Sequence, residues 1–280
     1  MNVQKKIAIG FIRAKLNGLV LINRKKAGEE AFKLFCTPFT RSKKQSDLFK
    51  EAEKLQLSFG QYHVKGFRFN PSGKKKLLIL HGFSSGSQHF EQYIQPLIAK
   101  NYEILAFDAP AHGASEGKSL HALDYSDMIR AVSKEYGPIH AYLAHSMGGL
   151  AVCLALETME HGPDTKLVLI APATETTTAI KNAFILLGLK NPDLKSALEA
   201  AIRAKSGKEA EWYSIRRAMH HIRATVSWFH DEEDETTPLK DVTYVMEDGH
   251  QHIRFRISKG LGHSKIYRDA GVVKQVVEFL

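Results

Sequence analysis

The stretch Ala141-Tyr142-Leu143-Ala144-His145-Ser146-Met147-Gly148-Gly149 decides the fold class. A short apolar run typical of a buried strand leads into Ser146, and an apolar helical stretch, Leu150 to Glu160, follows. A sharp strand-to-helix turn holds a serine in a strained, exposed position and needs small residues two places to either side. Ala144 and Gly148 meet that need. The pattern favours a nucleophilic serine over an ordinary helix N-cap serine.

Length and composition exclude several classes of protein. The chain has 280 residues, of which 44% are hydrophobic and 25% charged, as in soluble globular proteins. It has no run of about 18 apolar residues, so the sequence predicts no transmembrane helix. The formal charge is +9, but the basic residues are scattered and no aromatic pattern of an RNA-binding sheet accompanies them. We therefore expect a solvated surface and no nucleic-acid partner.

Cysteine usage and the first residues bear on location. Cys36 and Cys153 are too few for a disulfide framework, and we expect both to be reduced thiols in a cytoplasmic protein. The apolar residues 7–12 resemble the start of a signal peptide, but Arg13 and Lys15 interrupt them and no cleavage site follows closely. We expect an amphipathic helix here that packs on the domain or contacts a partner.

Short apolar runs alternate with helical stretches from about residue 55 onward. This alternation predicts a mostly parallel sheet with helices on both faces. The alternation stops between residues 174 and 221, which are typical of two or three helices and predict a helical cap, or lid. The sequence thus predicts an N-terminal helical extension at 1–54, a core at 55–173 and 222–280, and a cap at 174–221. The predicted strands are 55–59, 64–69, 77–80, 103–107, 139–144, 167–171, 225–229 and 253–257.

Polar, Gly-rich segments follow five of these strands, at the edge where such sheets bind ligands. With these segments in view, the chain resembles the α/β-hydrolase superfamily over about residues 60–280. The resemblance implies the α/β-hydrolase fold, with a small helical cap inserted late in a mostly parallel sheet. Ala144 replaces the usual glycine of the serine motif and adds one methyl group. The motifs that carry the resemblance are His81-Gly82, residues 108–117, the turn at Ser146, the loop at Asp234 and Gly262-His263.

The superfamily has its nucleophile, acid and histidine in that order along the chain. Its pattern places the acid four residues before a proline, a spacing that Asp234 meets. Asp231 is the alternative by position, and Glu175 is a more remote one. His263 stands out from the 14 histidines because it follows a strand within Gly-Leu-Gly-His. The predicted triad is Ser146, Asp234 and His263.

The resemblance also assigns a binding site for the substrate. It places the oxyanion-stabilising donors at the backbone N–H groups of Phe83 and Met147. The apolar content of the cap suggests an apolar acyl or alcohol group, unless these side chains only pack the cap on the core. The tentative pocket residues are Leu186, Leu187 and Trp212.

Together these features predict a carboxylesterase-like serine hydrolase that cleaves a carboxylic ester or thioester through an acyl-enzyme. An aspartate at position 146 would have indicated an epoxide or haloalkane hydrolase. Hydrolysis of a carbon–carbon bond is one alternative, and a non-catalytic binding protein of the same fold is another. No metal or organic cofactor is implied, since His220-His221 lacks ligand partners at useful spacing. The expected partner is a small-molecule ester or thioester, and the sequence predicts no oligomeric state.

Overall fold

The computed structural model of the protein describes residues 3–42, 44 and 46–280, with side chains from residue 7 onward. Residues 1, 2, 43 and 45 of the predicted N-terminal extension therefore lie outside the described residues. The chain divides into two compact units. The helical unit comprises Met1–Thr37 and Glu175–Ser214, and the sheet unit comprises Pro38–Thr174 and Ile215–Leu280.

The sheet unit is built on one sheet, with eight strands among the described residues, in the order β1-β2-β4-β3-β5-β6-β7-β8. Pairing is antiparallel between β1, β2 and β4 and parallel from β4 through β3 to β8. The predicted mostly parallel sheet is thus confirmed. The strands are β1 (Glu53–Phe59), β2 (Tyr62–Phe69), β3 (Lys75–Leu80), β4 (Tyr102–Phe107), β5 (Ala141–His145), β6 (Lys166–Ile170), β7 (Thr225–Asp231) and β8 (Ile253–Ser258).

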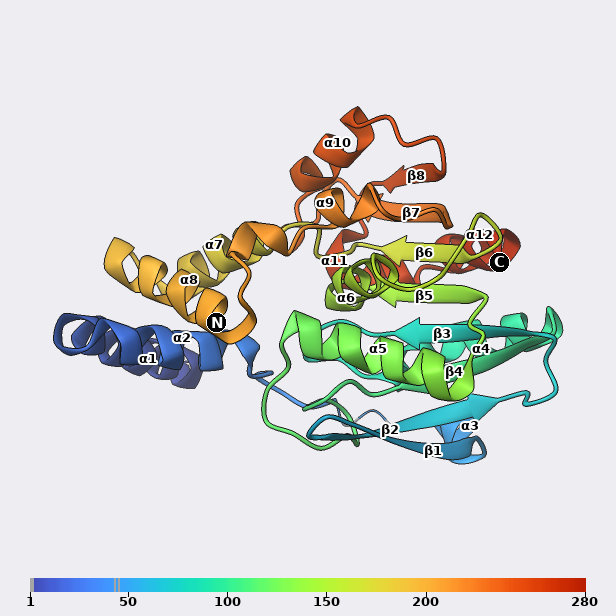
Figure 1. Cartoon of the computed structure of the whole chain (residues 1–280), viewed down its shortest axis with the longest axis horizontal. Coiled ribbons are helices and arrows are strands. Elements are labelled where there is room, and N and C mark those ends of the chain that lie inside the picture. The colour runs from blue at the N-terminus through green and yellow to red at the C-terminus, as the bar shows by residue number, and fades with distance from the viewer. Residues whose placement is uncertain (1–2, 43, 45) are drawn as a thin grey trace. The chain divides into compact units, whose positions relative to one another are not determined.

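Helices cover both faces of this sheet (Figure 1). Helices α5 (Ala122–Tyr136) and α6 (Met147–Leu156) pack together on one face, and α4 (Glu91–Ala99) and α12 (Ala270–Phe279) pack together on the other. The remaining helices of the sheet unit are α3 (Asp47–Lys50), α9 (Ile215–Met219), α10 (Leu239–Glu247), α11 (Gly262–Lys265), and the 3-10 turns Ser87–Phe90 and Ile266–Arg268.

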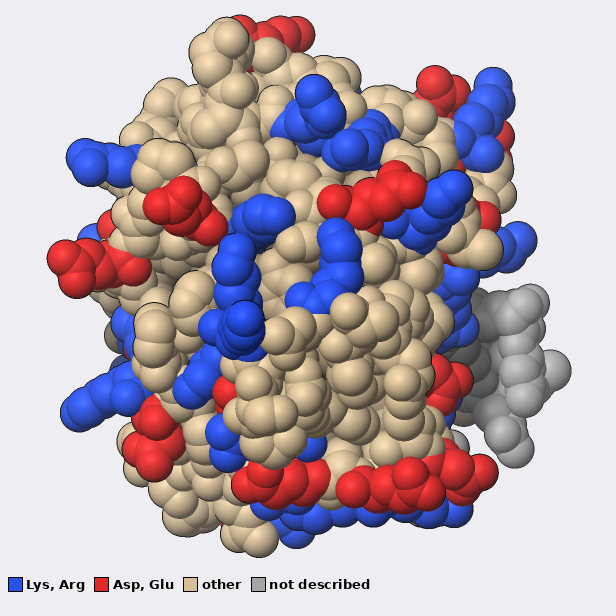
Figure 2. Space-filling view, turned by 90° about the vertical axis from the view of Figure 1, so that its right-hand side faces the viewer, with Lys and Arg blue, Asp and Glu red and all other residues tan. Residues whose placement is uncertain are grey.

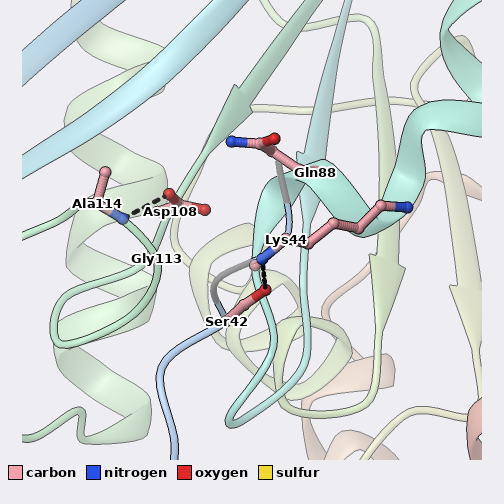
Figure 3. A pocket seen from close by; sticks show the side chains of 7 residues that line it. Ser42, Lys44, Gln88, Asp108, Gly113 and Ala114 are labelled. Atoms are coloured by element: carbon pink, nitrogen blue, oxygen red, sulfur yellow. Dashed lines mark hydrogen bonds between the residues drawn. The ribbon is translucent and has the colours of Figure 1, made fainter. Parts of the chain in front are cut away.

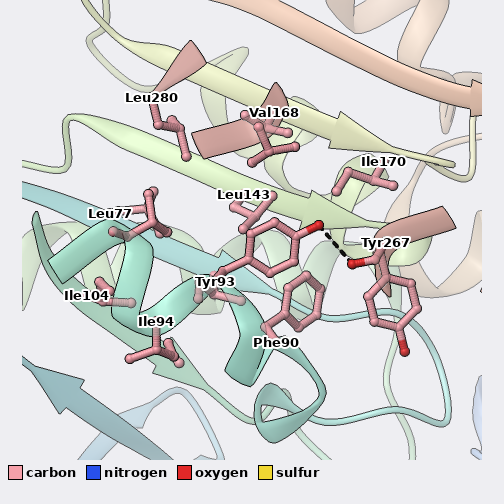
Figure 4. Packing of buried hydrophobic residues seen from close by; sticks show 14 of the residues in the cluster. Leu77, Phe90, Tyr93, Ile94, Ile104, Leu143, Val168, Ile170, Tyr267 and Leu280 are labelled. Carbon is pink, nitrogen blue, oxygen red and sulfur yellow. Dashed lines mark hydrogen bonds between the residues drawn. The ribbon is translucent and has the colours of Figure 1, made fainter. Parts of the chain in front are cut away.

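Successive side chains of a strand point to opposite faces of the sheet, so each strand contributes to a core on both faces. Leu77 and Ile79 of β3 join the cluster beneath α4 and α12, whereas Leu78 and Leu80, equally buried, are not part of it. Figure 4 shows this cluster, in which the Tyr93 hydroxyl donates a 2.8 Å hydrogen bond to the backbone carbonyl of Tyr267. The central strands are apolar on both faces because helices bury both sides, as their continuous apolar runs predicted.

The helical unit joins two segments that lie far apart in the sequence. Its elements are α1 (Val3–Ile22), α2 (Arg24–Cys36), α7 (Thr176–Leu187), α8 (Pro192–Ser206) and the 3-10 turn Ala210–Trp212. Helix α2 packs most extensively on α8, and α1 contacts α2, α7 and α8. At Gly28 the two backbones approach so closely that an added Cβ would lie 2.1 Å from the carbonyl oxygen of Ala197. The sequence prediction treated the N-terminal helices and the inserted helices separately, whereas the structure joins them.

No helix among the described residues combines the length and the apolar character that crossing a bilayer requires. Cys36 and Cys153 are both buried, and within the described part of the chain neither forms a disulfide.

Candidate active site

Ser146 occupies a strained turn between β5 and α6. Its φ of 54° and ψ of −122° lie in a region that side chains other than glycine rarely adopt. Helix α6 begins at Met147 rather than near Leu150, because the two glycines after the serine let it start beside β3. A Cβ on Gly148 would lie 2.6 Å from the carbonyl oxygen of Leu80. The turn holds the serine side chain at the carboxyl end of β5.

His263 and Asp234 meet Ser146 at this edge of the sheet. His263 Nε2 lies 3.1 Å from Ser146 Oγ, and His263 Nδ1 lies 2.8 Å from Asp234 Oδ2. An ionised carboxylate only accepts hydrogen bonds, so the Nδ1 proton points to Asp234 and leaves Nε2 free to accept from the serine hydroxyl. The structure therefore brings the three residues singled out by the sequence into one hydrogen-bonded chain.

Asp234 is fixed by its own loop. Burial raises the pKa of its carboxyl, but the hydrogen bond and charge of His263, with the donors of Thr237, outweigh burial and hold the pKa below its usual value. Oδ1 accepts from the backbone N–H groups of Thr236 and Thr237, at 2.9 and 2.8 Å. The Thr237 hydroxyl donates to Oδ2 at 2.8 Å and lies 3.2 Å from His263 Nδ1. Thr237 does not stand out in the sequence, although an aspartate three residues before a threonine is a spacing typical of such side-chain caps.

The alternative acids occupy other positions. Asp231 Oδ2 accepts from Ser258 Oγ at 2.7 Å and from the Leu261 N–H at 3.1 Å, and Oδ1 accepts from the Gly262 N–H at 2.9 Å. It thus fastens the loop that carries His263 without contacting the imidazole. Glu175 belongs to the helical unit, where its Oε1 accepts a 2.6 Å hydrogen bond from Ser214.

The two predicted oxyanion donors have no protein acceptor among the described residues. Met147 is the first residue of α6, so its backbone N–H is one of the unpaired donors at the positive end of the helix dipole. The N–H of Phe83 is likewise unpaired in the described part of the chain. The next N–H, of Ser84, donates at 2.9 Å to His112 Nε2.

His112 and His81 support the loop that carries Phe83. His112 donates from Nδ1 to the carbonyl of Pro110 at 2.9 Å, and His81 donates from Nδ1 to the carbonyl of Gly82 at 2.8 Å. His81 Nε2 accepts from the Ala109 N–H at 2.9 Å. Each ring thus uses one nitrogen as donor and the other as acceptor, which requires a neutral imidazole. Burial lowers the pKa of His112 to about 3.

His145, the residue before the serine, is buried beneath His263. Its Nε2 donates to the His263 backbone carbonyl at 3.0 Å, and the two ring centroids lie 4.8 Å apart. Burial, with the charge of His263, lowers the pKa of His145 to about 3. The ring packs against the proposed base and must stay uncharged to do so.

These lowered pKa values predict a pH-dependent stability. Between about pH 6.5 and pH 3 the unfolded chain binds protons on His112 and His145 that the folded chain does not. The free energy of unfolding should therefore fall with decreasing pH, by about 1.4 kcal/mol per pH unit for each histidine. Urea unfolding at pH 7 and pH 5 measures the slope. His145→Gln should make it shallower and the exposed His221→Gln should not; equal slopes in both variants would contradict the assignment.

A polar pocket lined in part by the segments that follow β3 and β4 (Figure 3) contains none of the three triad residues. Asp108 in its wall accepts from the Ser87 N–H and hydroxyl, both at 2.8 Å, and from the Ala114 N–H at 2.9 Å. This carboxylate joins the segment after β3 to the segment after β4, which supports a scaffolding role. The pocket measures about 310 Å³ and is lined by Ser42, Lys44, Gly86, Gln88, Asp108, Gly113 and Ala114.

His220 has neighbours that could bind a metal ion, and its position in the sequence did not reveal them. Ligand atoms of His220, Asp248 and His250 lie within 4.8 Å of one another, so within the described residues this group could offer three ligands to a metal ion. The expectation that His220 lacks ligand partners is therefore wrong. Arg216 already binds both Asp248 oxygens, at 2.8 and 2.6 Å, and its positive charge opposes a cation there.

The tentative pocket residues differ in exposure within the helical unit. Leu187 is buried in the core of that unit, Trp212 is half-buried with the Lys208 ammonium 5.2 Å from its ring centroid, and Leu186 is 55% exposed. Leu186 is thus the predicted pocket residue whose side chain is available for contact without unfolding.

Comparison with known proteins identifies the family of the chain. The family described as serine aminopeptidase, S33, matches residues 71–240. A Mycoplasma pneumoniae protein named "Putative esterase/lipase 3" is 27% identical over 116 residues, which cover 40% of this chain and 43% of that protein. This chain therefore matches less than half the length of that relative.

Solved structures share the fold at low identity. An esterase from Pyrococcus furiosus is similar with a TM-score of 0.64 and 17% identity, covering 88% of this chain and 97% of that one. A bacterial membrane phospholipase A gives a TM-score of 0.62 and 14% identity, covering 99% and 97%. The thioesterase domain of the curacin biosynthetic pathway gives 0.57 and 15%, covering 81% and 98%. By its sequence and its fold, the chain belongs to the serine aminopeptidase S33 family of α/β-hydrolases.

Proposed function

We propose that the protein is a serine hydrolase that cleaves a carboxylic ester or thioester. The observation that carries the proposal is the chain of hydrogen bonds from Ser146 Oγ to His263 at 3.1 Å and from His263 to Asp234 at 2.8 Å. A serine hydroxyl becomes nucleophilic when a neighbouring imidazole accepts its proton, and a carboxylate stabilises the imidazolium that forms. The esterase/lipase name of the Mycoplasma pneumoniae relative supports the same class of substrate.

The reaction would proceed in two halves. Ser146 Oγ attacks the carbonyl carbon while His263 Nε2 takes the hydroxyl proton, and the oxyanion forms opposite the unpaired N–H groups of Phe83 and Met147. His263 then gives the proton to the leaving alcohol or thiol, which leaves an acyl-enzyme. Water, deprotonated by the same imidazole, attacks the acyl carbon, and the carboxylic acid departs.

A fluorophosphonate probe tests this proposal directly. The probe should label the native protein at Ser146, and a panel of p-nitrophenyl esters and thioesters should be turned over. Labelling without turnover of any ester or thioester would favour the alternative of carbon–carbon bond hydrolysis. No labelling and no turnover by the folded protein would favour a non-catalytic binding protein of this fold.

We further propose that the helical unit selects the acyl group through Leu186 and Trp212, whereas Leu187, the third residue predicted for the pocket, packs inside that unit. Leu186→Ala should lower kcat/KM for long acyl chains by about tenfold relative to short ones, because one apolar contact contributes roughly 1 kcal/mol or more. Leu187→Ala should mainly destabilise the helical unit, since that side chain is buried. The exposed Ile257→Ala is the control. A chain-length profile unchanged by Leu186→Ala and Trp212→Ala would show that these side chains only pack the helices.

A further inference from the structure

Helix α1 is apolar on two opposite faces. One face, with Leu16 and Val20 buried, packs inside the helical unit. Successive residues of an α-helix are rotated by about 100° around its axis. On the opposite face of α1, an arc of about 100° contains no charged side chain between positions 7 and 22. We call this face the outer stripe; it consists of the exposed residues Ile7, Phe11, Ala14, Gly18, Leu21 and Ile22.

The outer stripe is strongly exposed. Phe11 is 70% exposed, Leu21 82% and Ile22 86%. Among the described residues, four of the nine exposed large hydrophobic side chains lie on this one helix. A contiguous row of exposed apolar side chains on a helix marks a surface that contacts another apolar phase, so we expect one to cover the outer stripe.

The charge of the chain is concentrated in the same unit. Residues 1–37 and 175–214 contain 14 Lys and Arg against 7 Asp and Glu, which gives +7 of the formal +9. The face of the molecule in Figure 2 mixes both signs. Near the outer stripe, Lys15 lies beside one edge of the apolar arc, where its ammonium is 2.6 Å from a carboxylate oxygen of Glu30, and Lys25 and Lys26 follow the helix. Within the described residues, neither Lys25 nor Lys26 forms an ion pair.

From these observations we propose that the outer stripe docks the helical unit onto an anionic lipid membrane, with α1 lying in the plane of the interface. An apolar arc flanked by basic side chains inserts among acyl chains while the Lys and Arg side chains contact anionic headgroups. A second copy of the chain is the less favourable occupant, because pairing two outer stripes would bring two helical units together, each with a net charge of +7. The proposal concerns binding alone and does not depend on hydrolytic activity.

Vesicle flotation with the full chain tests the proposal. Binding is measured on phosphatidylcholine vesicles with and without about 30% phosphatidylglycerol. We expect the protein to bind the anionic vesicles and to bind the neutral vesicles about tenfold more weakly. High salt should weaken binding to the anionic vesicles, because it shortens the Debye length. Phe11→Ser and Leu21→Ser should each weaken binding about tenfold without loss of folded structure, because both side chains are exposed. Lys25→Gln with Lys26→Gln should weaken binding only to the anionic vesicles.

Ile257→Ser is the matched control, since this side chain of β8 is 40% exposed but lies in the sheet unit. It should bind vesicles as the unsubstituted protein does. Absence of vesicle binding, or equal binding by Phe11→Ser and Ile257→Ser, would overturn the proposal. A Phe11-dependent dimer in analytical ultracentrifugation without vesicle binding would assign the stripe to a second copy instead. Salt-sensitive retention on heparin without vesicle binding would indicate that the helical unit binds nucleic acid instead.

Discussion

Replacing Ser146 by alanine is expected to lower kcat for ester hydrolysis by roughly 10³-fold or more. Alanine retains the Cβ, so the backbone strain of the turn, with its φ of 54°, is unchanged. Only the hydroxyl that lies 3.1 Å from His263 Nε2 is lost. The remaining site can still polarise a bound carbonyl but has no oxygen to form the acyl-enzyme. Steady-state kinetics on a p-nitrophenyl ester and fluorophosphonate labelling measure the effect.

The control for this substitution is Ser72→Ala, which removes an exposed hydroxyl from a turn. It should leave both kinetics and labelling unchanged. Circular dichroism and the melting temperature of Ser146→Ala should match those of the unsubstituted protein. Near-normal turnover by a folded Ser146→Ala variant would show that another residue is the nucleophile.

Asp234→Asn is expected to lower kcat by roughly 10²–10⁴-fold. The amide oxygen can keep the bonds from the Thr236 and Thr237 N–H groups, which turns the amide NH₂ toward His263. A donor in that place favours the imidazole tautomer with its proton on Nε2, which cannot accept the serine proton. The loss should therefore appear in kcat rather than in folding.

Asp231→Asn separates the two acids of this loop. Its carboxylate receives hydrogen bonds from Ser258, Leu261 and Gly262 but does not contact His263. We expect a lower melting temperature and a much smaller loss of kcat than for Asp234→Asn. If Asp231→Asn is the variant with the larger kinetic defect at a temperature where both are folded, the assignment of the acid is wrong.

The sequence predicted what is encoded locally. The mostly parallel sheet follows from apolar runs flanked by Gly-rich ends, and it is confirmed. Ser146 stood out because Ala144 and Gly148 flank it, and His263 because it follows a strand. In both cases a few adjacent residues determine the local backbone.

What the sequence missed depends on contacts between distant segments. Asp231 fastens residues 258–262, and His112 meets the Ser84 N–H across 28 positions. Neither hydrophobic periodicity nor a short sequence motif indicates which distant residues will contact each other. His220 gained its neighbours Asp248 and His250 for the same reason, because a helix and a strand intervene.

The close approach of Gly28 to Ala197 has a consequence for biosynthesis. Residues 1–37 share their apolar core with residues 175–214, so roughly 170 further residues must be made before α1 and α2 can bury their inner faces. At about 5–20 residues per second, the nascent chain carries α1 and α2 without their partner α8 for roughly ten to thirty seconds. Residues 1–37 thus leave the ribosome well before residues 175–214, which supply their native neighbours.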